Sequence, residues 1–166
     1  FAEDPSAVDE SWREEVSEIA GDALAPPGEG RLDAYFHRVH TRGDTMIFVE
    51  EDRVLFTGDV VMSQRFLAAQ PTSSITTWLK TVDELAALKP VRVVPSHGAT
   101  GDATLIARAR AFLQAVQARV GELKRTGKSV DDAVAAVVAE IAPSYPEWGN
   151  PSGAAAVARA AYAEAQ

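Results

Sequence analysis

The chain has 166 residues, of which 46% are hydrophobic and 24% are charged, as in an ordinary single globular domain. Its formal net charge of −8 argues against nucleic acid as the main partner, because phosphate binding needs clustered Lys and Arg. It has no cysteine, which excludes disulfides, thiol nucleophiles and Cys-ligated zinc, and no apolar run approaches the ~20 residues of a membrane span. We therefore expect a soluble protein that neither enters a membrane nor binds nucleic acid.

The first part of the chain predicts one helix and then three strands, from helical spacing of apolar residues followed by strand-like alternation. The expected elements are an amphipathic helix over about 6–24, strands within 32–39, 45–49 and 53–57, and a loop over 60–73. A Pro- and Gly-rich stretch separates the helix from the first strand.

The rest of the chain predicts a helix, a short strand and then three helices. The expected elements are a helix after the cap Ser74, a buried strand over 91–94, a helix over 102–127, a helix after Ser129 and a last helix capped by Ser152. Ser129 and Asp132 form a capping-box pattern, and the face of their helix expected to be buried comprises Val130, Val134, Val137, Val138 and Ile141. The order predicts an α/β fold with at most about four strands, a thin sheet for so many helices.

Three polar side chains follow predicted strands and are candidates for one site. They are His40 in His40-Thr41-Arg42-Gly43-Asp44-Thr45, Asp59 in Thr57-Gly58-Asp59, and His97 in Ser96-His97-Gly98. Because these residues lie 19 and 38 positions apart, only a sheet could bring them together. His nitrogen and Asp oxygen are typical zinc ligands. The competing interpretation is that each is a plain polar residue at the end of a strand, and we expect His37 to be a surface or edge residue rather than a ligand.

These three segments resemble the third, fourth and fifth motifs of the metallo-β-lactamase superfamily, commonly His-Thr-x-Gly-Asp/His-Thr, a strand ending in Gly-Asp, and Pro-Gly-His-Gly. In this chain Ser96 replaces the glycine of the fifth motif. The resemblance covers about residues 31–128. The segment Tyr145-Pro146-Glu147-Trp148 is similar to the tail of the branch that contains quinoprotein-associated and sulfur-oxidation-associated hydrolases.

The resemblance implies a role for each motif residue. His40 would complete one metal site and His97 the other, and Asp59 would bridge both metals and help to move the proton of the nucleophile. Thr41 and Asp44 would fix the loop of His40 from outside the ligand set. Gly58 would permit the turn that aims Asp59 inward. The metals would be two zinc ions in the intact parent, with iron or manganese as alternatives.

The family's first ligand motif, His-x-His-x-Asp-His, has no counterpart here, since the only histidines are His37, His40 and His97. The resemblance then implies half of an αββα sandwich: a small mixed sheet with helices on one side, plus C-terminal helices. We expect residues 1–128 to be the C-terminal half of a metallo-β-lactamase-like domain and residues 129–166 a helical extension packed on it. The first residue is Phe1, which favours a processed or truncated chain or a shifted numbering.

The function implied for the intact parent is hydrolysis of an ester, thioester, lactone or amide bond in a small molecule. The fragment by itself is expected to be inactive, and its site to bind metal weakly or not at all. Alternatives from other classes are a non-catalytic binding or assembly module and a half-domain that dimerises. The partner would be the missing N-terminal half or a second copy of the chain. Substrate and location, cytoplasmic or periplasmic, stay open.

Overall fold

The computed structural model describes residues 32–37, 39–41 and 43–166. The chain divides into two compact units, residues 1–30 and 31–166, and every described residue belongs to the second. The helix expected over 6–24 lies outside the described residues.

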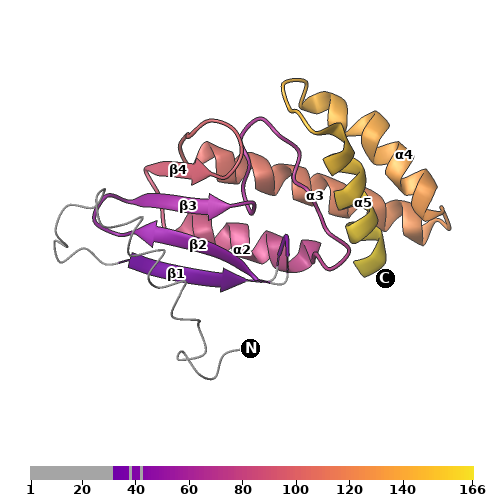
Figure 1. The fold of residues 1–166 in the computed structure, drawn as a ribbon. Coiled ribbons are helices and arrows are strands. Elements are labelled where there is room, and N and C mark those ends of the chain that lie inside the picture. Colours follow the sequence, from indigo (N-terminus) through magenta and orange to yellow (C-terminus); the bar gives the residue numbers. More distant parts are fainter. Residues whose placement is uncertain (1–31, 38, 42) are drawn as a thin grey trace, which may run out of the picture. The chain divides into compact units, whose positions relative to one another are not determined.

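Four strands form one mixed sheet in the order β1-β2-β3-β4 (Figure 1). Their bounds are β1 Leu32–His37, β2 Asp44–Val49, β3 Val54–Gly58 and β4 Arg92–Pro95. The pairs β1–β2 and β2–β3 are antiparallel, whereas β4 pairs with β3 in parallel. A parallel pair needs a crossover connection, and α2 (Ile75–Ala87) supplies it.

Helices follow the sheet in the predicted order. They are α3 Thr104–Arg125, α4 Val130–Glu140, the 3-10 turn η2 Ala142–Ser144 and α5 Pro151–Glu164. Together with the mixed sheet they confirm the predicted α/β class. Among the described residues, no helix combines the length and the apolar character that crossing a membrane would need.

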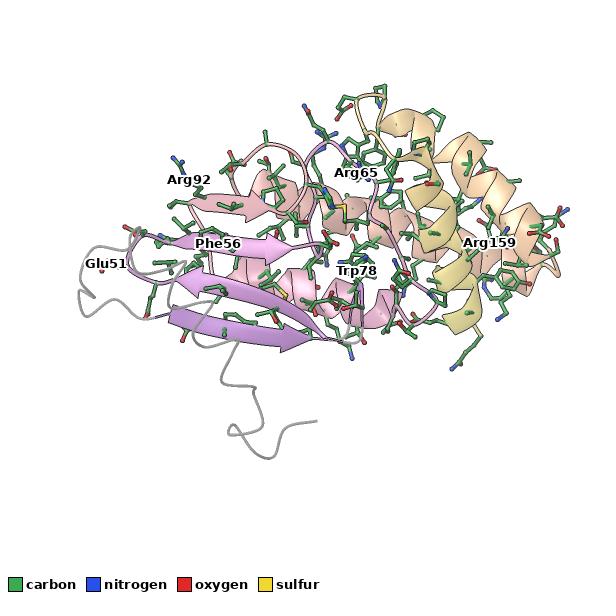
Figure 2. The ribbon with its side chains drawn as sticks, in the orientation of Figure 1. Glu51, Phe56, Arg65, Trp78, Arg92 and Arg159 are labelled. Carbon is green, nitrogen blue, oxygen red and sulfur yellow. The ribbon has the colours of Figure 1, made fainter. Side chains whose placement is uncertain are left out.

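The sheet has one buried face and one more exposed face, as strand alternation requires. Met46, Phe48 and Leu55 point into the core, where α2 and α3 lie behind the sheet in Figure 1. On the opposite face Ile47 is 40% exposed, and Phe56, labelled on β3 in Figure 2, is 43% exposed. Ile47 and Phe56 are register partners, so their side chains lie on the same face.

Local sequence signals explain most helix boundaries. Ser74 caps α2 by accepting a hydrogen bond from the amide of Thr77, and Ser129 and Asp132 form the predicted capping box of α4. The predicted cap of the last helix was wrong. Asn150, not Ser152, occupies the N-cap position, and Pro151 suits the first helical position.

The expected face of α4 is confirmed in part. Val137 is buried and Val134 and Ile141 pack against the core, whereas Val138 is 42% exposed and Ala133 is buried instead. The large apolar side chains suggested a wider buried face than the helix presents.

The segment before α5 joins an aromatic cluster. Phe66, Phe112, Tyr145 and Trp148 contact one another edge to face or at a tilt, with ring centroids 4.3–6.1 Å apart. The Arg108 guanidinium lies 5.3 Å from the Trp148 ring centroid. This cluster packs the middle of the 60–73 loop, at Phe66, against Phe112 of α3.

Candidate metal centre

Strands β1, β3 and β4 end on the same side of the sheet (Figure 1), and the three candidate ligands lie in the segments that follow them. His40 lies in the connection between β1 and β2, Asp59 directly follows β3, and His97 follows β4. Asp59 therefore comes from the strand between the other two. The sheet order thus places the Asp59 carboxylate between the imidazoles of His40 and His97. Residues so far apart in the sequence can meet only through pairing of their strands.

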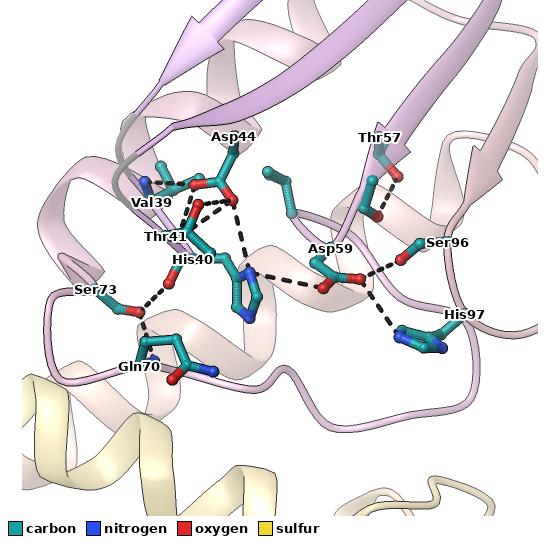
Figure 3. Close-up of polar contacts among 12 residues, drawn as sticks. Val39, His40, Thr41, Asp44, Thr57, Asp59, Gln70, Ser73, Ser96 and His97 are labelled. Atoms are coloured by element: carbon teal, nitrogen blue, oxygen red, sulfur yellow. Dashed lines mark hydrogen bonds and ion pairs between the residues drawn. The ribbon is translucent and has the colours of Figure 1, made fainter. Parts of the chain in front are cut away.

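The Asp59 carboxylate approaches one imidazole with each oxygen (Figure 3). Its Oδ2 lies 3.7 Å from Nδ1 of His40, and its Oδ1 lies 3.5 Å from Nε2 of His97. Both separations are longer than an ordinary N–H···O hydrogen bond. Two ligands bound at about 2.1 Å to one tetrahedral zinc lie about 3.4 Å apart, close to these values.

The site is closed on the His40 side and open on the His97 side. The exposed fractions of the side chains are 9% for His40, 31% for Asp59 and 49% for His97. Solvent or a further ligand can reach Asp59 and His97, whereas His40 is enclosed by its own loop and by Trp78.

Asp44 holds the loop of His40 from within. Its carboxylate accepts hydrogen bonds from the amides of Val39 and Thr41, at 3.0 and 2.9 Å, and from the Thr41 hydroxyl, at 2.9 Å (Figure 3). Its Oδ1 also lies 3.6 Å from Nδ1 of His40. Thr41 and Asp44 thus bond to each other within the His40 loop, and Asp44 lies next to the imidazole.

Gly58 supplies the turn that releases Asp59 from β3. Its φ of +51° lies in the left-handed region that glycine adopts without a Cβ penalty. The Val60 amide then donates to the Thr57 carbonyl at 3.1 Å, which closes the turn around Asp59.

Gly98 has a different reason to be glycine. The His97 carbonyl accepts a hydrogen bond from the Ser63 amide at 3.0 Å, which draws the two loops together. A Cβ on Gly98 would lie 2.1 Å from the Ser63 carbonyl oxygen, and its φ is +85°. Only glycine fits this close approach.

Ser96, the departure from the family pattern, contacts the site directly. Its hydroxyl donates a hydrogen bond to Oδ1 of Asp59 (Figure 3). His37 does not join the site; its imidazole contacts the Thr81 hydroxyl at 3.1 Å and Glu84 at 3.4 Å on α2.

Sequence reasoning missed the contribution of α2. Ser73, which is buried, donates its hydroxyl to the His40 carbonyl at 2.6 Å, and Trp78 packs against the His40 ring. Neither residue belongs to a motif, and the capping pattern around Ser74 was the one local signal nearby. Only the folded structure shows that the start of α2 contacts the His40 loop.

The metallo-beta-lactamase superfamily model matches residues 5–97, more than half of the chain. The chain belongs to the metallo-beta-lactamase superfamily. The match ends at His97, the last of the three candidate ligands.

Solved structures of this superfamily resemble the chain in part. A metallo-beta-lactamase from Pontibacter korlensis is 24% identical with a TM-score of 0.48, over 61% of this chain and 55% of its own. DIM-1 metallo-beta-lactamase exposed to ceftazidime is 16% identical with a TM-score of 0.47, over 69% and 64%. VMB-1 is 16% identical with a TM-score of 0.45, over 63% and 54%. The chain spans little more than half of the first of these proteins. No curated protein matches the sequence.

Members of this superfamily are commonly zinc-dependent, so the donor set must be tested against that metal. The types of donor atom and their spacing suit zinc, because each side of Asp59 offers one nitrogen and one oxygen. The number of donors is too small for zinc, since a catalytic zinc normally has about three protein ligands. Among the described residues, no group of three or more His, Cys, Asp or Glu is arranged to hold a metal ion.

Proposed function

We propose that this chain is the C-terminal half of a binuclear metal-dependent hydrolase that cleaves an ester, thioester, lactone or amide bond. The observation that supports this best is the Asp59 carboxylate, which approaches His40 with one oxygen and His97 with the other. Two adjacent metals bridged by one carboxylate would use this arrangement of donors.

In this proposal each residue has a defined task. His40 and His97 would each hold one metal, and Asp59 would contribute to both sites. Zinc bound there would supply an acidified water as the nucleophile. The Asp59 carboxylate would help to hold that water and to move its proton. Thr41 and Asp44 keep the His40 loop in place.

The remaining ligands have to come from outside the described residues, because two donors on each side are too few. A His-x-His-x-Asp-His segment on the missing N-terminal half is the proposed source. Such a segment encoded upstream of Phe1 would support the proposal. Its absence from the source transcript would contradict the proposal that the parent protein is a hydrolase.

The direct test is His40→Ala in the protein that contains this segment. We expect loss of hydrolysis together with loss of about one of two zinc ions by elemental analysis. His37→Ala is the matched control, because His37 contacts α2 and not Asp59. Near-normal turnover of His40→Ala would contradict the assignment.

A second candidate, a half-domain that associates through its sheet, is favoured by one observation. Ile47 and Phe56 expose apolar surface on one face, and such surface often marks an interaction site. The occupant would be the N-terminal half or, alternatively, a second copy of this chain.

Sedimentation of the purified chain separates these occupants. A dimer that Phe56→Asp dissociates, and that Val138→Asp on α4 leaves intact, would favour the second copy. Val138 is a suitable control because its exposed fraction, 42%, equals that of Phe56 within a percent. A monomer would favour the N-terminal half, and a monomer holding two zinc ions would contradict the ligand count.

A further inference from the structure

The first turn of α2 touches both segments that supply the proposed ligands. Trp78 is labelled in Figure 2 at the edge of the sheet where the strands end, and its side chain is fully buried. One indole therefore lies between the His40 loop and the turn that follows β3.

Toward His40, Trp78 offers its ring. The two ring centroids are 6.0 Å apart with an interplanar angle of 63°, an edge-to-face contact. Two neighbours of Trp78 hold the same loop through hydrogen bonds: the Ser73 hydroxyl donates to the His40 carbonyl at 2.6 Å, and the Ser74 amide donates to the Val39 carbonyl at 3.3 Å.

Toward Asp59, Trp78 offers its only polar atom. The indole Nε1–H donates to the Val60 carbonyl at 2.8 Å. Val60 directly follows Asp59 and is itself fully buried, so this bond fixes the chain at the point where the carboxylate leaves β3. A buried hydrogen bond of this kind is costly to leave unmade.

We propose that Trp78 is a positioning residue that sets the distance between His40 and Asp59. The proposal rests on the roles proposed above for those two side chains, although its geometry can be tested without metal or substrate. The ring contact by itself would fix only His40. The hydrogen bond to Val60 by itself would fix only the turn that carries Asp59. Trp78 makes both, so the two segments cannot shift independently while the indole stays in place.

Trp148 supplies the matched comparison. It is also buried, at 8% exposure, and packs against Phe66, Phe112 and Tyr145 rather than against the site. Within the part of the chain that the structure describes, its Nε1 has no hydrogen-bond partner. Trp→Phe at this position removes aromatic volume from the core but no hydrogen bond, whereas at Trp78 the same substitution also removes the bond to Val60.

The first experiment uses the unaltered chain labelled with 15N-tryptophan. The Trp78 indole proton should exchange with solvent at least about tenfold more slowly than that of free tryptophan, because exchange requires local opening. Exchange at the free rate would show that the bond to Val60 is not formed, and would overturn the proposal.

The second experiment compares NMR spectra of the metal-free variants at one fixed pH. Trp78→Phe should split or broaden the His40 ring signals and the backbone amide signals of Asp59 to Val61. Trp148→Phe should leave these signals in place, even if it lowers the melting temperature by as much. A purely structural role for Trp78 would not give this difference between the two variants in the His40 and Asp59–Val61 signals.

If His40 and Val60 respond no more to Trp78→Phe than to Trp148→Phe, the positioning role is overturned. Should Trp78→Phe fail to fold, benzothienylalanine at position 78 is used instead, because it replaces Nε1–H by sulfur in a ring of nearly the same shape. Loss of hydrolysis in His40→Ala belongs to the proposed function and does not bear on these spectra, so the two proposals can fail separately.

Discussion

The Ser96 hydroxyl donates a hydrogen bond to Oδ1 of Asp59, and the same oxygen lies 3.5 Å from Nε2 of His97. The sequence pattern marked Ser96 only as a departure from glycine. In the structure the Ser96 hydroxyl contacts Oδ1 of Asp59, the carboxylate oxygen that faces His97, the more exposed of the two imidazoles. A metal on the His97 side would share that oxygen with the hydroxyl.

Ser96→Ala should therefore raise the affinity of the chain for Zn²⁺ by about two- to tenfold, because a hydrogen bond contributes about 0.5–1.5 kcal/mol net. Competition with a zinc-binding dye measures the change. Ser152→Ala, on the exposed first turn of α5, is the control. Weaker binding by Ser96→Ala would mean that the hydroxyl orients the carboxylate rather than competing for it.

Gly98→Ala should destabilise the chain by about 3 kcal/mol or more, since left-handed backbone costs about 1–3 kcal/mol and a clash with the Ser63 carbonyl is added. Urea unfolding measures the loss. Gly121→Ala is the paired control: it lies within α3 with nothing within 4 Å of the added Cβ. That substitution should stabilise by about 0.5–1 kcal/mol. Equal behaviour of the two variants would contradict the close approach of the His97 and Ser63 loops.

Asp44→Ala should cost about 3 kcal/mol, because it leaves the buried amide of Val39 without its acceptor and also releases Thr41. Asp44→Asn keeps one acceptor oxygen and should lose less. Asp131→Ala removes an exposed carboxylate paired with Arg159 and should change stability by less than about 1 kcal/mol. An Asp44→Ala variant as stable as Asp131→Ala would show that Asp44 does not hold the His40 loop.

Stability should fall in acid because two carboxylates of α4 are held in their charged form. The hydrogen bonds with Arg119 lower the pKa of Glu140 below 4.5, and the Ser129 hydroxyl lowers the pKa of Asp132 below 3.8. Groups with a depressed folded pKa stabilise above their unfolded pKa, and this contribution is lost as pH falls through the folded pKa. The loss should begin below about pH 4.5.

Thermal unfolding between pH 7 and pH 3 measures this slope. Glu140→Gln should flatten it, since glutamine does not titrate in this range. Asp131→Asn, whose carboxylate on the same helix is 78% exposed, should leave the slope nearly unchanged. An unaltered slope in Glu140→Gln would contradict the link between this pair and acid stability.

The elements and the candidate ligands were accessible from the sequence because their signals are local. Alternation predicts a strand, and each candidate ligand lies within a few residues of the end of a strand, as with Asp59 directly after β3. The contacts of Trp78 were not accessible, because its two partners lie 38 and 18 positions away and only the crossover between β3 and β4 brings them together. The wrong choice of Ser152 as a cap has a similar cause: the Asn150 side chain donates to the distant Phe66 carbonyl, which no pattern within the helix indicates.

The sheet order also has a consequence for the sequence of folding events. His40 and Asp59 belong to consecutive antiparallel hairpins, whose contacts close over short stretches of chain. His97 reaches Asp59 only after the chain has passed through α2 and β4 has paired in parallel with β3. Because closing longer loops is slower, we expect the half of the site with His40 to form first during folding and His97 to arrive last. A chain released before β4 has docked would then hold Asp59 with one imidazole neighbour.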